Sequence, residues 1–281
     1  MRSRPSRRNS AKHESREGAW SLIRFFAFVA ILTWAFRSLV AQPFDIPSGS
    51  MLPTLYIGDY LFVAKWPYGY SSYSFPLGLP RFNGRLFEHL PHRGDVVVFR
   101  HPTEDDDLIK RVIGLPGDTV ALSNGQLILN GKPVWRRKLP PMQIPISANS
   151  PCSVVPPAVA STVLKAGKPF CSVPAYLETL PDGPSFTTLD EIDNGPADNF
   201  GPAVVPPGHV FLMGDNRDDS LDSRFPSSVG GIGMVPIDHL IGRALVTFWS
   251  TDGNASYLKP WTWFSALRFS RIGNGYTGDA E

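Results

Sequence analysis

The segment RGDVVVFRHPTEDDDLIKRVIGLPGD, residues 93–118, decides the fold that this sequence predicts. It holds two apolar runs rich in Val and Ile, 96–99 and 108–113, on either side of the acidic run 104–107. β-Branched residues favour strands, and two such runs around a polar tip are typical of a hairpin. We therefore expect two paired strands joined by a solvated turn.

Turn signals recur along the chain. Gly-Asp pairs precede apolar runs at 58–59, 94–95 and 117–118. Asn-Gly pairs at 124–125 and 130–131 flank the apolar run 126–129 and are strong hairpin signals. Two later strands are expected at 210–213 and 244–249. No helical period is sustained in this part of the chain, so we predict a mainly β class, a Greek-key or partly closed β-barrel domain.

Residues 139–207 differ in composition from the β-rich segments. They hold half of the 28 prolines and both cysteines, Cys152 and Cys171. We interpret them as an irregular Pro-rich insertion. In an exported domain the cysteines are expected to form a disulfide, whereas in a cytosolic one they would be free thiols.

One segment near the N-terminus is apolar enough to span a bilayer. Arg24 and Arg37 bracket an uncharged core, and by snorkelling they extend the span to about Trp20–Val40. Residues 1–18 carry a net charge of +4 within a chain of net charge +2, which predicts a cytoplasmic N-terminus and an external domain. The small total charge gives no case for nucleic-acid binding.

Two other interpretations of this segment are open. A cleavable signal peptide needs small residues just before the cut, and Leu39 is a poor match at the third position. A buried amphipathic helix needs a repeating polar face, which residues 25–36 lack. An uncleaved anchor is favoured. The expected organisation is a basic leader 1–18, an anchor 19–40, a β domain of 41–138 plus 208–256, the insertion 139–207, and an aromatic-rich tail 257–281 that contacts lipid or closes the core.

Ser50 and Lys110 are the candidate reactive pair. Ser50 follows the expected anchor in a loop constrained by Pro47 and Pro53. Lys110 lies inside an apolar strand, where burial disfavours the ammonium and can lower its pKa by up to ~3–5 units. A neutral lysine can then activate a serine as histidine does elsewhere. Arg111 falls on the opposite face of the strand, where it can reach acidic partners.

The run 214–224, GDNRDDSLDSR, is unusually rich in charge. It departs from a calcium-binding EF-hand loop because it lacks the sixth-position Gly and carries Arg217 and Arg224 as built-in counterions. Internal salt bridges explain it better. No Cys/His spacing suits zinc, so we predict an enzyme without a metal or other cofactor.

These segments together resemble bacterial type I signal peptidases. The resemblance rests on residues 47–59, 93–99, 110–118 and 214–224, in matching order. It implies a Ser/Lys endopeptidase that removes signal peptides from exported preproteins, after small residues at the first and third positions before the cut. It also implies a single-pass protein of the inner membrane, with the catalytic domain outside and no obligate protein partner. Some relatives carry two transmembrane helices, whereas this chain shows one.

The resemblance also assigns roles. Ser50 would be the nucleophile and Lys110 the general base, with Ser48 contributing to the oxyanion hole and Ser220 orienting the lysine. The implied substrate-pocket residues are Phe44, Ile46, Met51, Leu55, Leu108 and Ile109. The implied structural ion-pair residues are Arg111, Asp215, Arg217, Asp222 and Arg224.

Other functions compete with this one. A second Ser/Lys processing protease, such as a pilin-processing relative or a self-cleaving repressor, would share the chemistry. A Ser-His-Asp hydrolase would draw on one of the six histidines. A membrane-anchored β domain that only binds peptides would need no nucleophile at all.

Overall fold

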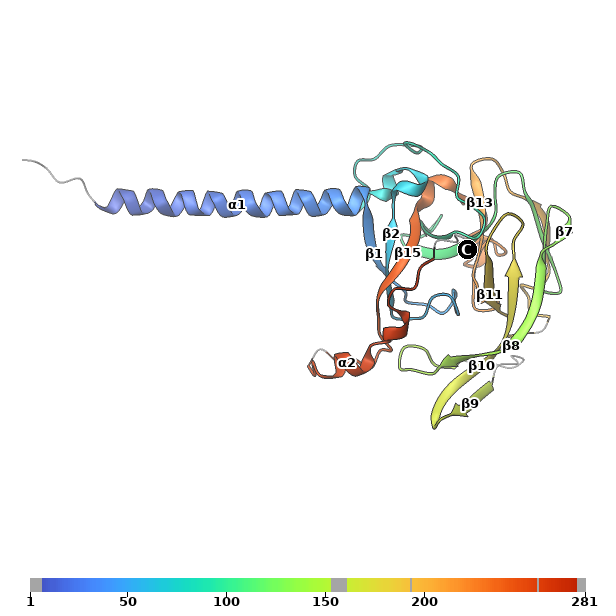
Figure 1. The fold of residues 1–281 in the computed structure, drawn as a ribbon. Coiled ribbons are helices and arrows are strands. Elements are labelled where there is room, and N and C mark those ends of the chain that lie inside the picture. Colours follow the sequence, from blue (N-terminus) through green and yellow to red (C-terminus); the bar gives the residue numbers. More distant parts are fainter. Residues whose placement is uncertain (1–6, 153–160, 193, 257, 277–281) are drawn as a thin grey trace, which may run out of the picture.

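The N-terminal helix leaves the β domain as a long rod. In a computed structural model, the structure describes residues 7–152, 161–192, 194–256 and 258–276, and α1 spans Arg7–Leu39 (Figure 1). Its part Trp20–Leu39 is long and apolar enough to cross a membrane, and almost all of it is exposed. An exposed apolar rod is consistent with a membrane anchor. Residues 1–6 and the side chains of residues 7–19 lie outside the described part, so the leader charge stays a sequence prediction.

The main sheet has seven strands in the order β1-β2-β15-β3-β4-β13-β14 and curls as a half-barrel. The predicted hairpin is β3 and β4, which pair antiparallel with Val97 opposite Lys110. The mainly β class behind one apolar helix is therefore confirmed. The strands are β1 (Ala41–Asp45), β2 (Asp59–Ala64), β3 (Val96–Arg100), β4 (Asp107–Gly114), β13 (His209–Met213), β14 (Val235–Pro236) and β15 (Leu240–Ser250).

Two smaller sheets complete the β domain. One has the order β12-β5-β6-β7, and in the other β8, β9 and β11 all pair with β10. Their strands are β5 (Thr119–Ser123), β6 (Gln126–Leu129), β7 (Lys132–Pro133), β8 (Trp135–Pro145), β9 (Ser161–Lys165), β10 (Lys168–Thr179), β11 (Ser185–Leu189) and β12 (Phe200–Val204). Single 3₁₀ turns lie at 66–68, 72–74, 76–78, 227–229, 237–239 and 269–271.

The expectation of an irregular insertion at 139–207 is wrong for most of its described residues. They form β9, β10, β11 and β12 and continue β8 (Figure 1). Proline removes a backbone donor and is tolerated at strand edges and bulges, and Pro174 lies at the bulge where β10 shifts register against β8. Pairing between segments far apart in the sequence decides this sheet, and local composition does not reveal it. Residues 153–160 lie outside the description.

The aromatic tail has one buried part, as expected if it closes the core, and one exposed part, as expected if it contacts lipid. Tyr276 is buried in a core cluster with Ile46 and Met51, and its hydroxyl lies 2.6 Å from Thr247 Oγ1. Trp261 and Phe264, at the short helix α2 (Thr262–Ala266), are 69% and 75% exposed. The tail therefore closes the core at Tyr276 and leaves an aromatic surface at α2. Tyr257 and residues 277–281 lie outside the described part.

Cys152 and Cys171 are joined by a disulfide across 19 positions, with Cα atoms 5.3 Å apart. Closing a loop of this length restricts the unfolded chain and is worth about 3 kcal/mol. We expect the double variant Cys152→Ser/Cys171→Ser to lose about that much unfolding free energy in urea titrations under oxidising conditions. Reductant should lower the stability of the wild type to the level of the variant, and equal stability of both proteins under oxidising conditions would contradict the assignment.

Candidate active site

Ser50 lies in a tight loop between β1 and β2. Backbone hydrogen bonds from Leu52 to Gly49 and from Leu55 to Met51 fold the loop on itself, and Asn216 donates its backbone N–H to the Ser50 carbonyl at 3.1 Å. Ser50 is 7% exposed. The loop is thus fixed both by its own turns and by the charge-rich run 214–224.

Lys110 points from β4 at Ser50. Its Nζ lies 2.7 Å from Ser50 Oγ and donates to the Ile109 carbonyl at 3.1 Å. Burial lowers the pKa of Lys110 to about 8, partly opposed by the carboxylates of Asp222, Asp219 and Asp215. The acidic tip 104–107 of the hairpin is exposed, as the sequence predicts. The geometry suits a neutral amine that accepts the serine proton.

Burial alone does not distinguish Lys110. Lys65 is also fully buried, and burial lowers its pKa to about 8. Its Nζ contacts Gln42 Oε1 at 2.9 Å and the Ser74 carbonyl at 2.6 Å. Both contacted atoms are carbonyl oxygens and neither is a hydroxyl, so the contact with Ser50 Oγ is what makes Lys110 a candidate base.

Ser48 lies beside Ser50, whereas the hydrogen bond of Ser220 goes to Asp222. The two hydroxyl oxygens of Ser48 and Ser50 are 3.3 Å apart. The Ser220 hydroxyl donates to Asp222 Oδ2 at 2.8 Å and, among the described residues, makes no hydrogen bond with Lys110. Ser220 Oγ and the Ser50 carbonyl oxygen both approach Gly214, so Ser220 lies near the site and its role in orienting the lysine stays a prediction.

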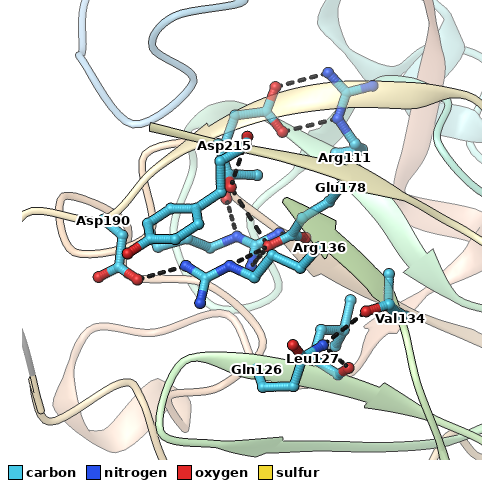
Figure 2. Close-up of polar contacts among 12 residues, drawn as sticks. Arg111, Gln126, Leu127, Val134, Arg136, Glu178, Asp190 and Asp215 are labelled. Carbon is cyan, nitrogen blue, oxygen red and sulfur yellow. Dashed lines mark hydrogen bonds and ion pairs between the residues drawn. The ribbon is translucent and has the colours of Figure 1, made fainter. Parts of the chain in front are cut away.

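The run 214–224 forms a network of ion pairs. Asp215 receives two hydrogen bonds from Arg111, at 2.7 and 2.6 Å, as Figure 2 shows. Arg224 pairs with Asp222 at 2.8 Å. Arg217 pairs with Glu178 of β10 at 2.5 Å, a residue that sequence reasoning missed because it lies in the weakly patterned insertion. All five expected ion-pair residues are thus brought together in buried contacts.

Gly214 is where the network meets the nucleophile. A Cβ at this position would lie 2.4 Å from Ser220 Oγ and 2.5 Å from the Ser50 carbonyl oxygen. Its backbone N–H donates to Asp222 Oδ2 at 3.0 Å. Burial alone would raise the pKa of Asp222, but the Arg224 guanidinium and the hydrogen bonds from Gly214 and Ser220 hold it below its ordinary value.

Five of the six expected pocket residues gather in one cluster. Ile46, Met51, Leu55 and Ile109 are buried together, with Phe44 packed against them. Leu108 packs in a different cluster with Val112 and Val210. Leu108 lies on the same face of β4 as Lys110, because residues two apart in a strand share a face, so its pocket role stays a prediction.

This geometry bears on two alternatives, a Ser-His-Asp hydrolase and a metal site. Within the described part of the chain, Ser50 Oγ has hydrogen bonds to Lys110 and Ser48 and none to a histidine. The carboxylates of Asp190, Asp198 and Asp218 cluster closely enough for a metal ion. However, Arg136 pairs with Asp190 at 2.5 Å (Figure 2), and Asp218 accepts two backbone N–H groups. Arg136 and these backbone donors thus already occupy two of the three carboxylates.

The fold and the site define a β protein behind an apolar helix, with a buried serine and lysine in contact. The sequence matches the family described as "Signal peptidase, peptidase S26" over residues 19–249. The chain belongs to this family of peptidases.

Two relatives from Rickettsia, of similar length to this chain, support this assignment. The Signal peptidase I of Rickettsia typhi is 34% identical over 88% of this chain and 90% of its own length. The Signal peptidase I of Rickettsia conorii is 33% identical over 91% of this chain and 92% of its own length. A solved Signal peptidase I from Enterococcus faecalis V583 is 24% identical and covers 55% of this chain and 97% of its own, with a TM-score of 0.28.

The buried pair Arg111–Asp215 should be a main support of the site. Replacing Asp215 with Asn leaves the guanidinium buried without its counter-charge, which costs about 3–5 kcal/mol. We expect that loss in the unfolding free energy of Asp215→Asn, measured by denaturant titration. Asp105→Asn is the matched control, because Asp105 pairs with Arg100 at 2.5 Å while fully exposed. Equal effects of the two variants would contradict this assignment.

Proposed function

We propose that this protein is a membrane-anchored serine endopeptidase that removes signal peptides from exported preproteins, with Ser50 as nucleophile and Lys110 as general base. The observation that carries the proposal is the 2.7 Å contact between Lys110 Nζ and Ser50 Oγ in a buried site. The relatives from Rickettsia are Signal peptidase I proteins, which supports the substrate class.

The chemistry follows from the contacts. Neutral Lys110 takes the Ser50 proton as Oγ attacks the carbonyl carbon of the scissile bond. The Ser48 hydroxyl and the Ser50 backbone N–H donate to the oxyanion, and losing one such donor costs about 2.7–4 kcal/mol. Lysine then returns the proton to the leaving amine. Water, activated by the same amine, hydrolyses the acyl-enzyme and restores Ser50.

Substrate choice would come from the first apolar cluster. Ile46, Met51 and Ile109 are buried close to the nucleophile loop, with the partly buried Phe44 at their edge. Such a closely packed surface suits small side chains at the first and third positions before the cut. The cluster therefore supports the specificity expected of a signal peptide.

Attachment to the membrane would also contribute to the selection of preprotein substrates. The helix α1 would anchor the protein in the inner membrane, and the basic leader favours a cytoplasmic N-terminus with the β domain outside. The lipid bilayer and the preprotein are the expected partners, and the chemistry needs no cofactor. Anchoring raises the effective concentration of the site near signal peptides held in the same membrane.

Cleavage of a preprotein by purified variants tests the proposal. Ser50→Ala and Lys110→Ala should each lower kcat by about 10⁴-fold or more, because the two groups act as a unit. His101→Ala and the exposed-lysine control Lys132→Ala should cleave at close to the wild-type rate. Near-normal cleavage by Lys110→Ala would contradict the proposed base, and cleavage by Ser50→Ala would favour a function without this nucleophile.

A further inference from the structure

A second apolar surface lies on the other side of the nucleophile loop. Met51 packs into the cluster of Ile46 and Ile109, whereas its neighbour Leu52 packs into a separate cluster with Ile144 and Leu189. The side chains of the adjacent residues Met51 and Leu52 thus pack into different apolar clusters. A polypeptide bound across Ser50 that fills the first surface continues toward the second.

A cavity opens on this second surface. It measures about 390 Å³, within the ~300–1,000 Å³ range of ligand pockets, and Gly49, the residue before the nucleophile, is part of its wall. Leu52, Ile144 and Leu189 contribute apolar walls. An extended chain advances ~3.3 Å per residue, so the cavity is reached by the first residues after the scissile bond.

The cavity is bordered by carboxylates. Asp219 is exposed, and its Oδ2 would lie 2.9 Å from a Cβ built on Gly49. Glu191 lines the cavity and accepts a hydrogen bond from Asn216 Nδ2 at 3.2 Å. Asp218 also lines it, but it is occupied by the backbone N–H groups of Glu191 and Ile192. Asp219 and Glu191 have fewer hydrogen bonds from the protein than Asp218, so their carboxylates are the ones most available to a ligand.

Asn216 connects the acidic border of the cavity to Ser50 by hydrogen bonds. Asn216 donates its side-chain amide to Glu191 and its backbone N–H to the Ser50 carbonyl, at 3.2 and 3.1 Å. A chain seated against Glu191 therefore lies against the same residue that fixes Ser50. This connection makes the cavity part of the reaction site.

We infer that this cavity binds the segment of the preprotein directly after the scissile bond, and that Asp219 and Glu191 select uncharged or cationic residues there and disfavour acidic ones. The inference rests on the proposed function. Cleavage also creates an α-ammonium group at this place, which the same carboxylates attract.

The test uses two preproteins that differ at one position, the second residue after the cut, which is Lys in one and Glu in the other. The full-length wild type in detergent, assayed at about pH 8.5, should show a kcat/KM about tenfold higher for the Lys preprotein. Glu191→Gln/Asp219→Asn should reduce that ratio to near one. Both preproteins meet the same base in each variant, so the ratio isolates this subsite from any change in the pKa of Lys110.

Glu104→Gln is the matched control, since it removes an exposed carboxylate at the tip of the β3–β4 hairpin, and it should keep the tenfold ratio. A ratio near one in the wild type, or a ratio that persists in the double variant, would overturn the subsite while leaving the proposed function intact. If no preprotein is cleaved by the wild type, the proposed function fails first.

Discussion

The proposed mechanism depends on an uncharged amine, that of Lys110, beside a guanidinium that stays charged, that of Arg111. Lys110 and Arg111 are neighbours in β4, yet they meet opposite surroundings. Arg111 has the two oxygens of Asp215, whereas the hydrogen bonds of the Lys110 amine to described residues go to a hydroxyl and a backbone carbonyl. Burial without a paired carboxylate disfavours the ammonium, which lowers the pKa of Lys110 to about 8.

The arginines around this amine have a role beyond packing. Asp215 and Asp222 both raise the pKa of Lys110, and each is paired with a guanidinium, from Arg111 and Arg224. A carboxylate that already has a partner attracts the lysine less than a free one would. The counterions thus come from β4 and from the charge-rich run itself, and the run also holds the Ser50 backbone through the N–H of Asn216.

The features that could be predicted from the sequence are those that a local pattern of residues encodes. The β3–β4 hairpin follows from two β-branched runs around an acidic tip, and Ser50 and Lys110 stand out by chemistry and by resemblance. The second sheet could not be predicted, because β8 and β10 pair over a long separation and proline obscures their strand pattern. Glu178 is hidden for the same reason. The pocket role of Leu108 and the orienting role of Ser220 stay predictions: Leu108 packs in a different cluster from Ile109, and the Ser220 hydroxyl donates to Asp222.

The most direct measurement is the titration of the Lys110 amine itself, by NMR of protein labelled at lysine Nζ and Cε in detergent micelles. The Lys110→Met variant assigns the signal and separates it from that of Lys65, which is also buried. The account predicts a midpoint at about pH 8 for Lys110, so that the amine is increasingly neutral above this pH. A midpoint near the ordinary lysine value of about 10.4 would contradict it, because the base would then be charged wherever the enzyme is expected to work.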